Sequence, residues 1–144
     1  MNKTKDRMGG FIAAEIFSVQ DIESFIVKNS RVDIVFKPYY LSTNLDIVKN
    51  GVSASAPCVI SKSGKIYNID ITIEIKEFNN SPFTSFNKYL CILTLATGEM
   101  HVFGAPQFPL IISAEPIYSK TPSGRHGGLL RITGKQPHNV LIVQ

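Results

Sequence analysis

One stretch of the sequence alternates strictly between apolar and polar residues. In KIYNIDITIEIKEF, residues 65–78, apolar side chains occupy every second position from Tyr67 to Ile75, with polar or charged side chains between them. Successive side chains of a β-strand point to opposite faces, so this pattern predicts one long strand with a buried and a solvent-exposed face. Such a strand is typical of an antiparallel sheet that is covered on one side only.

Shorter apolar runs separated by turn residues predict further strands. Gly64 predicts a tight turn before the long strand, and ATGE at 96–99 predicts a hairpin that joins two flanking strands. The other strands are expected at 10–17, 31–36, 58–60, 88–96, 100–103, 110–114, 128–133 and 140–143, with a less regular one at 44–49.

Helix is expected at one place, residues 19–27. Ile22, Phe25 and Ile26 would share one face of a helix there. Ser18 precedes this segment and can accept a hydrogen bond from its first turn, as N-cap residues do. We therefore predict an all-β fold, a mainly antiparallel β-sandwich or barrel with at most one short helix.

The chain has the size and composition of a single domain. It has 144 residues, of which 44% are hydrophobic and 18% charged, enough to fill a core. We expect one domain over 1–144 with a short N-terminal arm at 1–8, and two longer loops at 79–88 and 115–128. The apolar runs are far shorter than the roughly 20 residues of a membrane span, so no membrane contact is expected. Cys58 and Cys91 form no CxxC pair, and a disulfide between them stays an open alternative.

The formal charge of +4 comes from the C-terminal segment, because no Asp or Glu follows Glu115. Such an asymmetry indicates an acidic partner or nucleic acid, or else solvated charges spread over two strands and a loop. Two phenylalanines in the polar loop at 79–88 either cover the sheet edge or anchor a partner protein, and Tyr39 and Tyr40 pose the same choice. The candidate partner contacts are Phe83, Phe86, Lys120, Arg125, His126, Arg131 and Lys135.

No residue pattern predicts catalysis, a metal site or a cofactor. Gly128 and Gly134 are too far apart for a phosphate-binding loop, and the three histidines lack metal-ligand spacing. Asp70 and Glu74 would lie about 13 Å apart along a strand, farther than the roughly 6.5–9.5 Å between the carboxylates of inverting glycosidases. We therefore expect a protein that is not an enzyme.

A small β-barrel that binds single-stranded nucleic acid is the alternative. Such barrels stack bases on aromatic side chains beside a basic groove. Phe83 and Phe86 could supply the stacking and the basic C-terminal segment the groove. In this sequence, however, the aromatic and the basic residues occupy different parts of the chain.

The segment GEMHVFGAPQFPL at 98–110, followed by SKTPSGRHGG and LLRITGKQPHNVLIV, resembles small virion proteins of tailed bacteriophages and prophages that are associated with the tail or neck. The similarity covers about residues 88–144, and Ala105 stands where the group is expected to have Thr. The matching positions are Phe103, Gly104, Ala105, Pro106, Pro109, Leu110, Gly124, Gly128, Thr133, Gly134 and Pro137.

The resemblance implies a structural subunit of a virion, made in the host cytoplasm. Its partners would be other virion proteins and copies of itself, in a ring that needs complementary patches on opposite sides of each subunit. Within the matching segment, Gly98 is expected to turn the hairpin and Gly104 to end its second strand. Pro106 and Pro109 have no backbone N–H, so they should form a stiff crossover that leads into the next strand.

Overall fold

The computed structural model describes residues 10–76, 88–117 and 127–143. These residues form two β-sheets, and apart from one 3₁₀ turn at Val19–Asp21 (η1) they contain no helix. Nearly all their strand pairs are antiparallel. The predicted all-β, mainly antiparallel fold is therefore confirmed.

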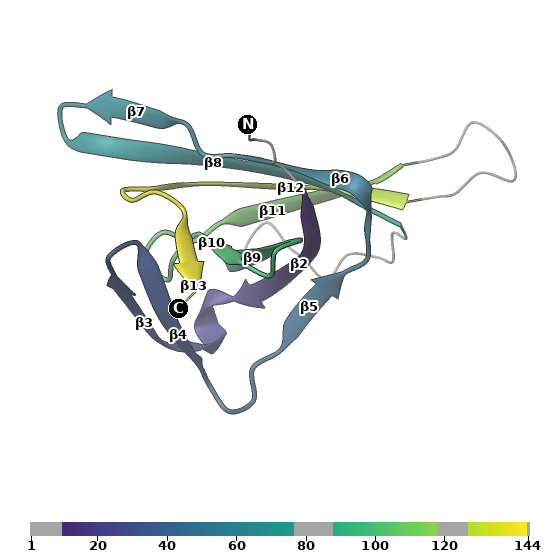
Figure 1. Ribbon diagram of the computed structural model, residues 1–144, viewed down its shortest axis with the longest axis horizontal. Helices are drawn as coiled ribbons and strands as arrows, with labels where there is room; N and C mark the ends of the chain where they lie inside the picture. The colour runs from purple at the N-terminus through teal and green to yellow at the C-terminus, as the bar shows by residue number, and fades with distance from the viewer. Residues whose placement is uncertain (1–9, 77–87, 118–126, 144) are drawn as a thin grey trace, which may run out of the picture.

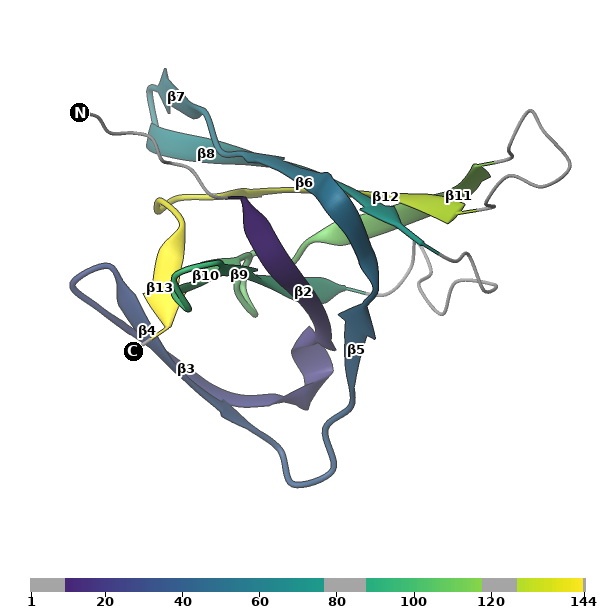
Figure 2. The same ribbon diagram turned by 45° about the vertical axis from the view of Figure 1, so that its right-hand side comes forward.

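The larger sheet curls into a half-barrel, as Figures 1 and 2 show. β3 and β5 are its two edges, and β4 runs parallel to its neighbour β13. In sheet order its strands are Ile22–Lys28 (β3), Arg31–Phe36 (β4), Leu141–Val143 (β13), Met100–Phe103 (β10), Tyr89–Leu95 (β9), Phe11–Ser18 (β2) and Ser42–Leu45 (β5).

The smaller sheet is flatter and covers the convex side of the half-barrel (Figure 1). β8 is its longest strand, and both β6 and β7 pair with it, β6 near its end and β7 near its start. The strands are Ile111–Ile117 (β11), Gly127–Gln136 (β12), Gly64–Ile75 (β8), Ile47–Ser55 (β6) and Cys58–Ser61 (β7).

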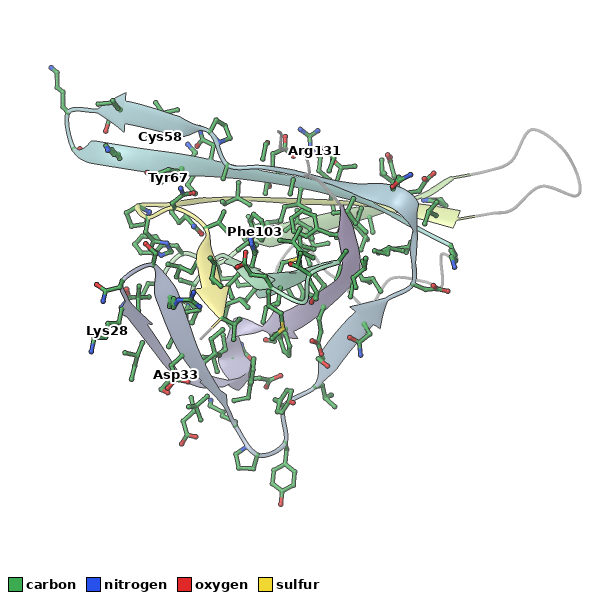
Figure 3. All side chains as sticks on the ribbon, viewed as in Figure 1. Lys28, Asp33, Cys58, Tyr67, Phe103 and Arg131 are labelled. Carbon is green, nitrogen blue, oxygen red and sulfur yellow. The ribbon has the colours of Figure 1, made fainter. Side chains whose placement is uncertain are left out.

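The first hydrophobic core lies between the two sheets. The alternation in β8 has the predicted effect, because Ile69, Ile71 and Ile73 are buried in this core while the residues between them are partly exposed. Figure 3 shows Phe103 in the layer between the sheets and Arg131 on the outer side of the smaller sheet.

A second core fills the inside of the half-barrel. Strand β9 contributes to both cores: Cys91 and Leu93 face the smaller sheet, whereas Leu90 and Ile92 point into the half-barrel. A strand that is buried on both faces has no polar alternation, which explains the continuous apolar run in this part of the sequence. The other buried members of the second core are Phe17, Val32, Val102 and Leu141.

The prediction of a helix at 19–27 is wrong. Ser18 does cap a turn, since its hydroxyl oxygen accepts a hydrogen bond from the backbone N–H of Gln20 at 3.3 Å, but that 3₁₀ turn ends at Asp21. The chain then forms β3, which pairs with β4 through a two-residue turn at Asn29 and Ser30. No helix among the described residues has the length and apolar character of a membrane span.

Several expected boundaries also differ. The segment at 44–49 divides at Asp46, because the chain passes there from β5 in one sheet to β6 in the other. The Asp46 carbonyl accepts a hydrogen bond from the backbone N–H of Lys76 at 2.8 Å at this crossing. β8 ends at Ile75, before the expected 78, and β12 continues to Gln136. The loop expected at 115–128 is shorter at both ends, since β11 reaches Ile117 and β12 begins at Gly127.

Candidate interaction site

The connection from β10 to β11 carries the chain from the half-barrel to the smaller sheet. Gly104 has a φ of 90° and leads into a tight turn in which Ala105 and Phe108 exchange two backbone hydrogen bonds of 3.1 and 3.0 Å. Pro106 and Gln107 occupy the tip of this turn. After Pro109, the N–H of Leu110 donates to the carbonyl of Tyr89 at 2.8 Å, so the connection is fixed at both ends.

Gln136, at the end of β12, holds this connection from within. Its side chain is 1% exposed, and its Oε1 accepts a hydrogen bond from the N–H of Gly104 at 2.9 Å. Its Nε2 donates to the carbonyl oxygens of His138 and Asn139 at 2.8 and 3.2 Å. A buried amide that satisfies three backbone groups at once keeps the β10–β11 and β12–β13 connections together.

A groove of about 460 Å³ lies between this turn and the edge strand β3. One wall is formed by β3 residues from Ile22 to Val27, and the other by the turn from Ala105 to Phe108, with His138 next to Phe108. We call it the β3 groove. Apolar side chains and the polar groups of Glu23, Gln107 and His138 both line it, so it suits an amphipathic side chain of a partner.

The connection between β4 and β5 is a short, exposed turn with two tyrosines. It spans residues 37–41 and lies at the bottom of Figures 1 and 2, away from the smaller sheet. Tyr39 is 94% exposed and Leu41 80% exposed. The two tyrosines differ: the Tyr40 ring stacks on Phe36, whereas the Tyr39 side chain points into solvent.

The hairpin formed by β7 and the start of β8 also exposes apolar side chains. Figure 3 shows it, marked by Cys58 and Tyr67, extending past the half-barrel. Ile60 is 77% exposed, and Val59 is exposed as well. Val59 pairs with Ile66 and Ile60 with Lys65, so the two exposed side chains lie on opposite faces of the hairpin.

Of the basic residues expected as partner contacts, the structure describes two, and both are exposed on β12. Arg131 lies on the outer face of β12, 3.4 Å from the carboxylate of Asp70, and Lys135 is exposed further along the same strand. Five other candidates fall outside the described residues, namely Phe83, Phe86, Lys120, Arg125 and His126.

Residues considered for chemistry are dispersed over the fold. His101 contacts Glu99 at 2.8 Å in the β9–β10 hairpin, and the part of the chain with described structure contains no group of three His, Cys, Asp or Glu suited to a metal ion. Cys58 is exposed and Cys91 is buried, and both are free thiols. Burial raises the pKa of the Cys91 thiol well above its ordinary value.

The sequence reasoning did not find the β3 groove. Its walls come from three separate segments, within residues 22–27, 105–108 and at 138. Because a helix was predicted at 19–27, an edge strand was not expected there. The β7–β8 hairpin was predicted from the strand at 58–60 and the turn at Gly64, and the structure adds that Val59 and Ile60 are exposed on it. Searches with the chain found no matching protein-family model, no matching curated protein and no matching solved structure.

Proposed function

We propose that this protein is a non-enzymatic structural subunit of a tailed-bacteriophage virion, in the tail or neck, that assembles with copies of itself and with other virion proteins. The proposal combines the resemblance of residues 88–144 with one observation that carries it. That observation is the β7–β8 hairpin, which extends from the body and exposes apolar side chains on both of its faces.

A hairpin of this kind is unfavourable on an isolated subunit. Two strands without a covering layer are marginally stable in water, and a partner that packs on such a hairpin would bury its exposed apolar side chains. Ile60 and Val59 lie on opposite faces, so a neighbouring protein that encloses the hairpin would bury both. Assembly therefore provides the second layer that the hairpin lacks.

Three positions of the resemblance also pack against one another. Leu110 is fully buried, and a Cβ atom added to Gly104 would lie 2.8 Å from its Cγ. A Cβ atom added to Gly134 would lie 2.5 Å from Cδ2 of the same leucine. These three residues thus form one packing unit where the two sheets are connected.

Analysis of virions tests the proposed role directly. Particles produced from the phage or prophage genome that carries this gene should contain the protein, detected by mass spectrometry of purified virions and by immunogold labelling at the tail or neck. Deleting the gene should give tailless or unjoined particles. Normal, infectious particles without the protein would contradict the proposal.

A second experiment tests the hairpin. The purified protein, alone and together with the products of flanking genes, is examined by light scattering and negative-stain microscopy. We expect assemblies that are lost in the double variant Val59→Ser, Ile60→Ser and retained in Ile111→Ser, which removes an exposed apolar side chain from the same sheet. Circular dichroism confirms that each variant is folded. A strictly monomeric protein that joins none of these products would count against the proposal.

The nucleic-acid alternative has its own outcome. Binding of single-stranded oligonucleotides that weakens steeply with salt, and that falls on Arg125→Ala or Lys135→Ala, would favour it. Arg131 is already paired with Asp70, so its replacement should have the smaller effect on such binding.

A further inference from the structure

Stacked aromatic rings support the base of the turn at 37–41. Tyr40 stacks on Phe36 with 4.6 Å between ring centroids, and Phe36 stacks on the buried ring of Phe17 at 4.5 Å. This column continues into the second core, so the base of the turn is part of the packed interior. Contacts within a single copy therefore hold the conformation of the turn.

Hydrogen bonds hold both ends of the same turn. The N–H of Tyr40 donates to the carbonyl of Lys37 at 3.1 Å, which closes a four-residue turn with Pro38 at its second position. The N–H of Lys37 donates to the backbone carbonyl of Asp21 at 2.8 Å, and the N–H of Leu41 donates to Oδ2 of Asp21 at 3.4 Å. A rigid turn that exposes Tyr39 and Leu41 loses little conformational entropy on binding, as expected of an interface anchor.

The β3 groove has the size and chemistry to accept this anchor. Its volume of about 460 Å³ accommodates a tyrosine side chain, and Phe25, Val27 and Phe108 provide apolar walls for the ring. A buried tyrosine hydroxyl needs a hydrogen-bond partner, and the polar groups at Glu23, Gln107 and His138 can supply one.

The charges next to the turn and the groove are complementary. Lys37 is exposed at the start of the turn, and Glu23 is exposed in the groove wall. A turn that enters the groove therefore brings a positive side chain towards a negative one. Such pairing favours this contact over a contact of two turns, in which Lys37 would meet another lysine.

We infer that the turn at 37–41 of one copy docks into the β3 groove of a second copy of this chain, with Tyr39 as the anchor. The inference rests on the assembly role proposed above and names one of its contacts. Within one copy the turn cannot fill its own groove, because Asp21 and Phe36 hold it and Tyr39 stays 94% exposed.

The turn and the groove are neighbours on each copy, which favours a reciprocal contact. Ile22 of the groove pairs with Phe36, the residue that precedes the turn. Two copies related by a two-fold axis can then exchange turns, so that each anchor fills the other copy's groove in a self-complementary interface.

Cross-linking between two different variants tests the contact. In a Cys58→Ser background, which removes the exposed thiol, one protein carries Tyr39→Cys and the other Gln107→Cys. Mild oxidation of the mixture should give a disulfide-linked heterodimer in higher yield than the disulfide-linked homodimer that either protein gives alone. The control replaces Gln107→Cys by Thr97→Cys, at an exposed position in the β9–β10 turn. No heterodimer, or equal yield with the control, would overturn the inference.

Affinity provides the second measurement. Analytical ultracentrifugation should show self-association that Tyr39→Ser weakens about 30-fold, the loss expected of a hot-spot residue. Phe108→Ser in the groove should weaken it as well, whereas Ile12→Ser, which removes an exposed apolar side chain of β2, should leave it unchanged. Self-association that Tyr39→Ser does not alter would overturn the inference.

These outcomes are distinct from those that test the proposed function. A protein that is monomeric alone but joins other virion proteins would overturn the contact and leave the virion role standing. Absence of the protein from virions would overturn the role, whatever the state of the purified chain.

Discussion

Gly98 and Gly104 adopt similar backbone conformations in different surroundings. Their φ angles are 94° and 90°, in a region of backbone conformation that residues other than glycine rarely adopt. At Gly98, in the β9–β10 turn, an added Cβ atom would meet nothing within 4 Å. At Gly104 it would lie 2.8 Å from Cγ of Leu110, which belongs to the core. The two glycines therefore separate the cost of backbone strain from the cost of crowding.

Alanine substitutions at the two positions should differ accordingly. Gly98→Ala should lower the free energy of unfolding by about 1–2 kcal/mol, the cost of the left-handed conformation alone. Gly104→Ala should lower it by about 3–4 kcal/mol, because overpacking against Leu110 adds to that cost. Urea denaturation of the two variants measures both values, and equal losses would contradict the role assigned to Leu110.

Gln136 makes a different kind of residue-scale contribution. Gln136→Leu preserves the approximate volume but leaves the Gly104 N–H and the carbonyls of His138 and Asn139 without their side-chain partner. We expect a loss of about 2–3 kcal/mol in the free energy of unfolding. Gln107→Leu, at the exposed tip of the nearby turn, is the control and should change stability by less than about 0.5 kcal/mol.

The two cysteines should differ in reactivity. At pH 8 a thiol reagent such as DTNB should modify exposed Cys58 and leave buried Cys91 intact until the protein unfolds. Because the folded pKa of Cys91 is raised, its contribution to stability is fully present below the unfolded pKa of about 8.5 and is lost as pH rises beyond it. Two reactive thiols in the native protein would contradict this assignment.

At the scale of elements, the sequence predicted strands both where one face is buried, as in β8, and where both faces are buried, as in β9. The alternation from Tyr67 to Ile75 appears in the structure as the buried and exposed faces of β8. At 19–27 the pattern is ambiguous, because β3 is an edge strand with exposed apolar residues such as Ile26 and Val27. Apolar side chains on both faces imitate a helical spacing. The sequence at Asn29 and Ser30 did not predict the β3–β4 turn, because two-residue hairpin turns of this kind favour Asn-Gly.

Features that join distant segments were not predictable from local patterns. The passage from one sheet to the other at Asp46 depends on its bond to Lys76, and the β3 groove combines three separate segments. Turn residues, in contrast, have local causes. The glycines and prolines of 98–110 indicated a turn-rich connection, although not that it would form a groove wall.

The prolines of the β10–β11 connection give a prediction at this scale. Pro106 follows Ala105 in a turn closed by two hydrogen bonds, and Pro109 precedes the bridge between Leu110 and Tyr89. Pro109→Gly should lower the free energy of unfolding by about 0.5–1 kcal/mol, because the unfolded chain gains conformational freedom. Pro106→Gly should behave similarly, and the double variant should also assemble less well. Thermal unfolding and light scattering measure the two effects, and a double variant as stable as the parent would contradict them.

Viewed as a whole, the molecule has two cores that share three neighbouring strands, β2, β9 and β10. The core between the sheets and the core inside the half-barrel meet at β9, whose successive residues point alternately into each. Loss of order in β9 would expose both cores at once. This arrangement links the half-barrel and the smaller sheet through the same strands.

The shared strands predict one cooperative unfolding transition. Leu93→Ala removes a buried side chain from the core between the sheets, and Leu90→Ala removes one from the core inside the half-barrel. Each should cost about 2–5 kcal/mol, and each should shift the whole transition rather than part of it. Far-ultraviolet circular dichroism reports on both sheets, while tyrosine fluorescence, free of tryptophan interference in this chain, includes buried Tyr89. Coincident curves in all three proteins are expected because neither core can lose β9 alone. A Leu90→Ala protein that melts in two steps, with the half-barrel first, would show that the cores are independent.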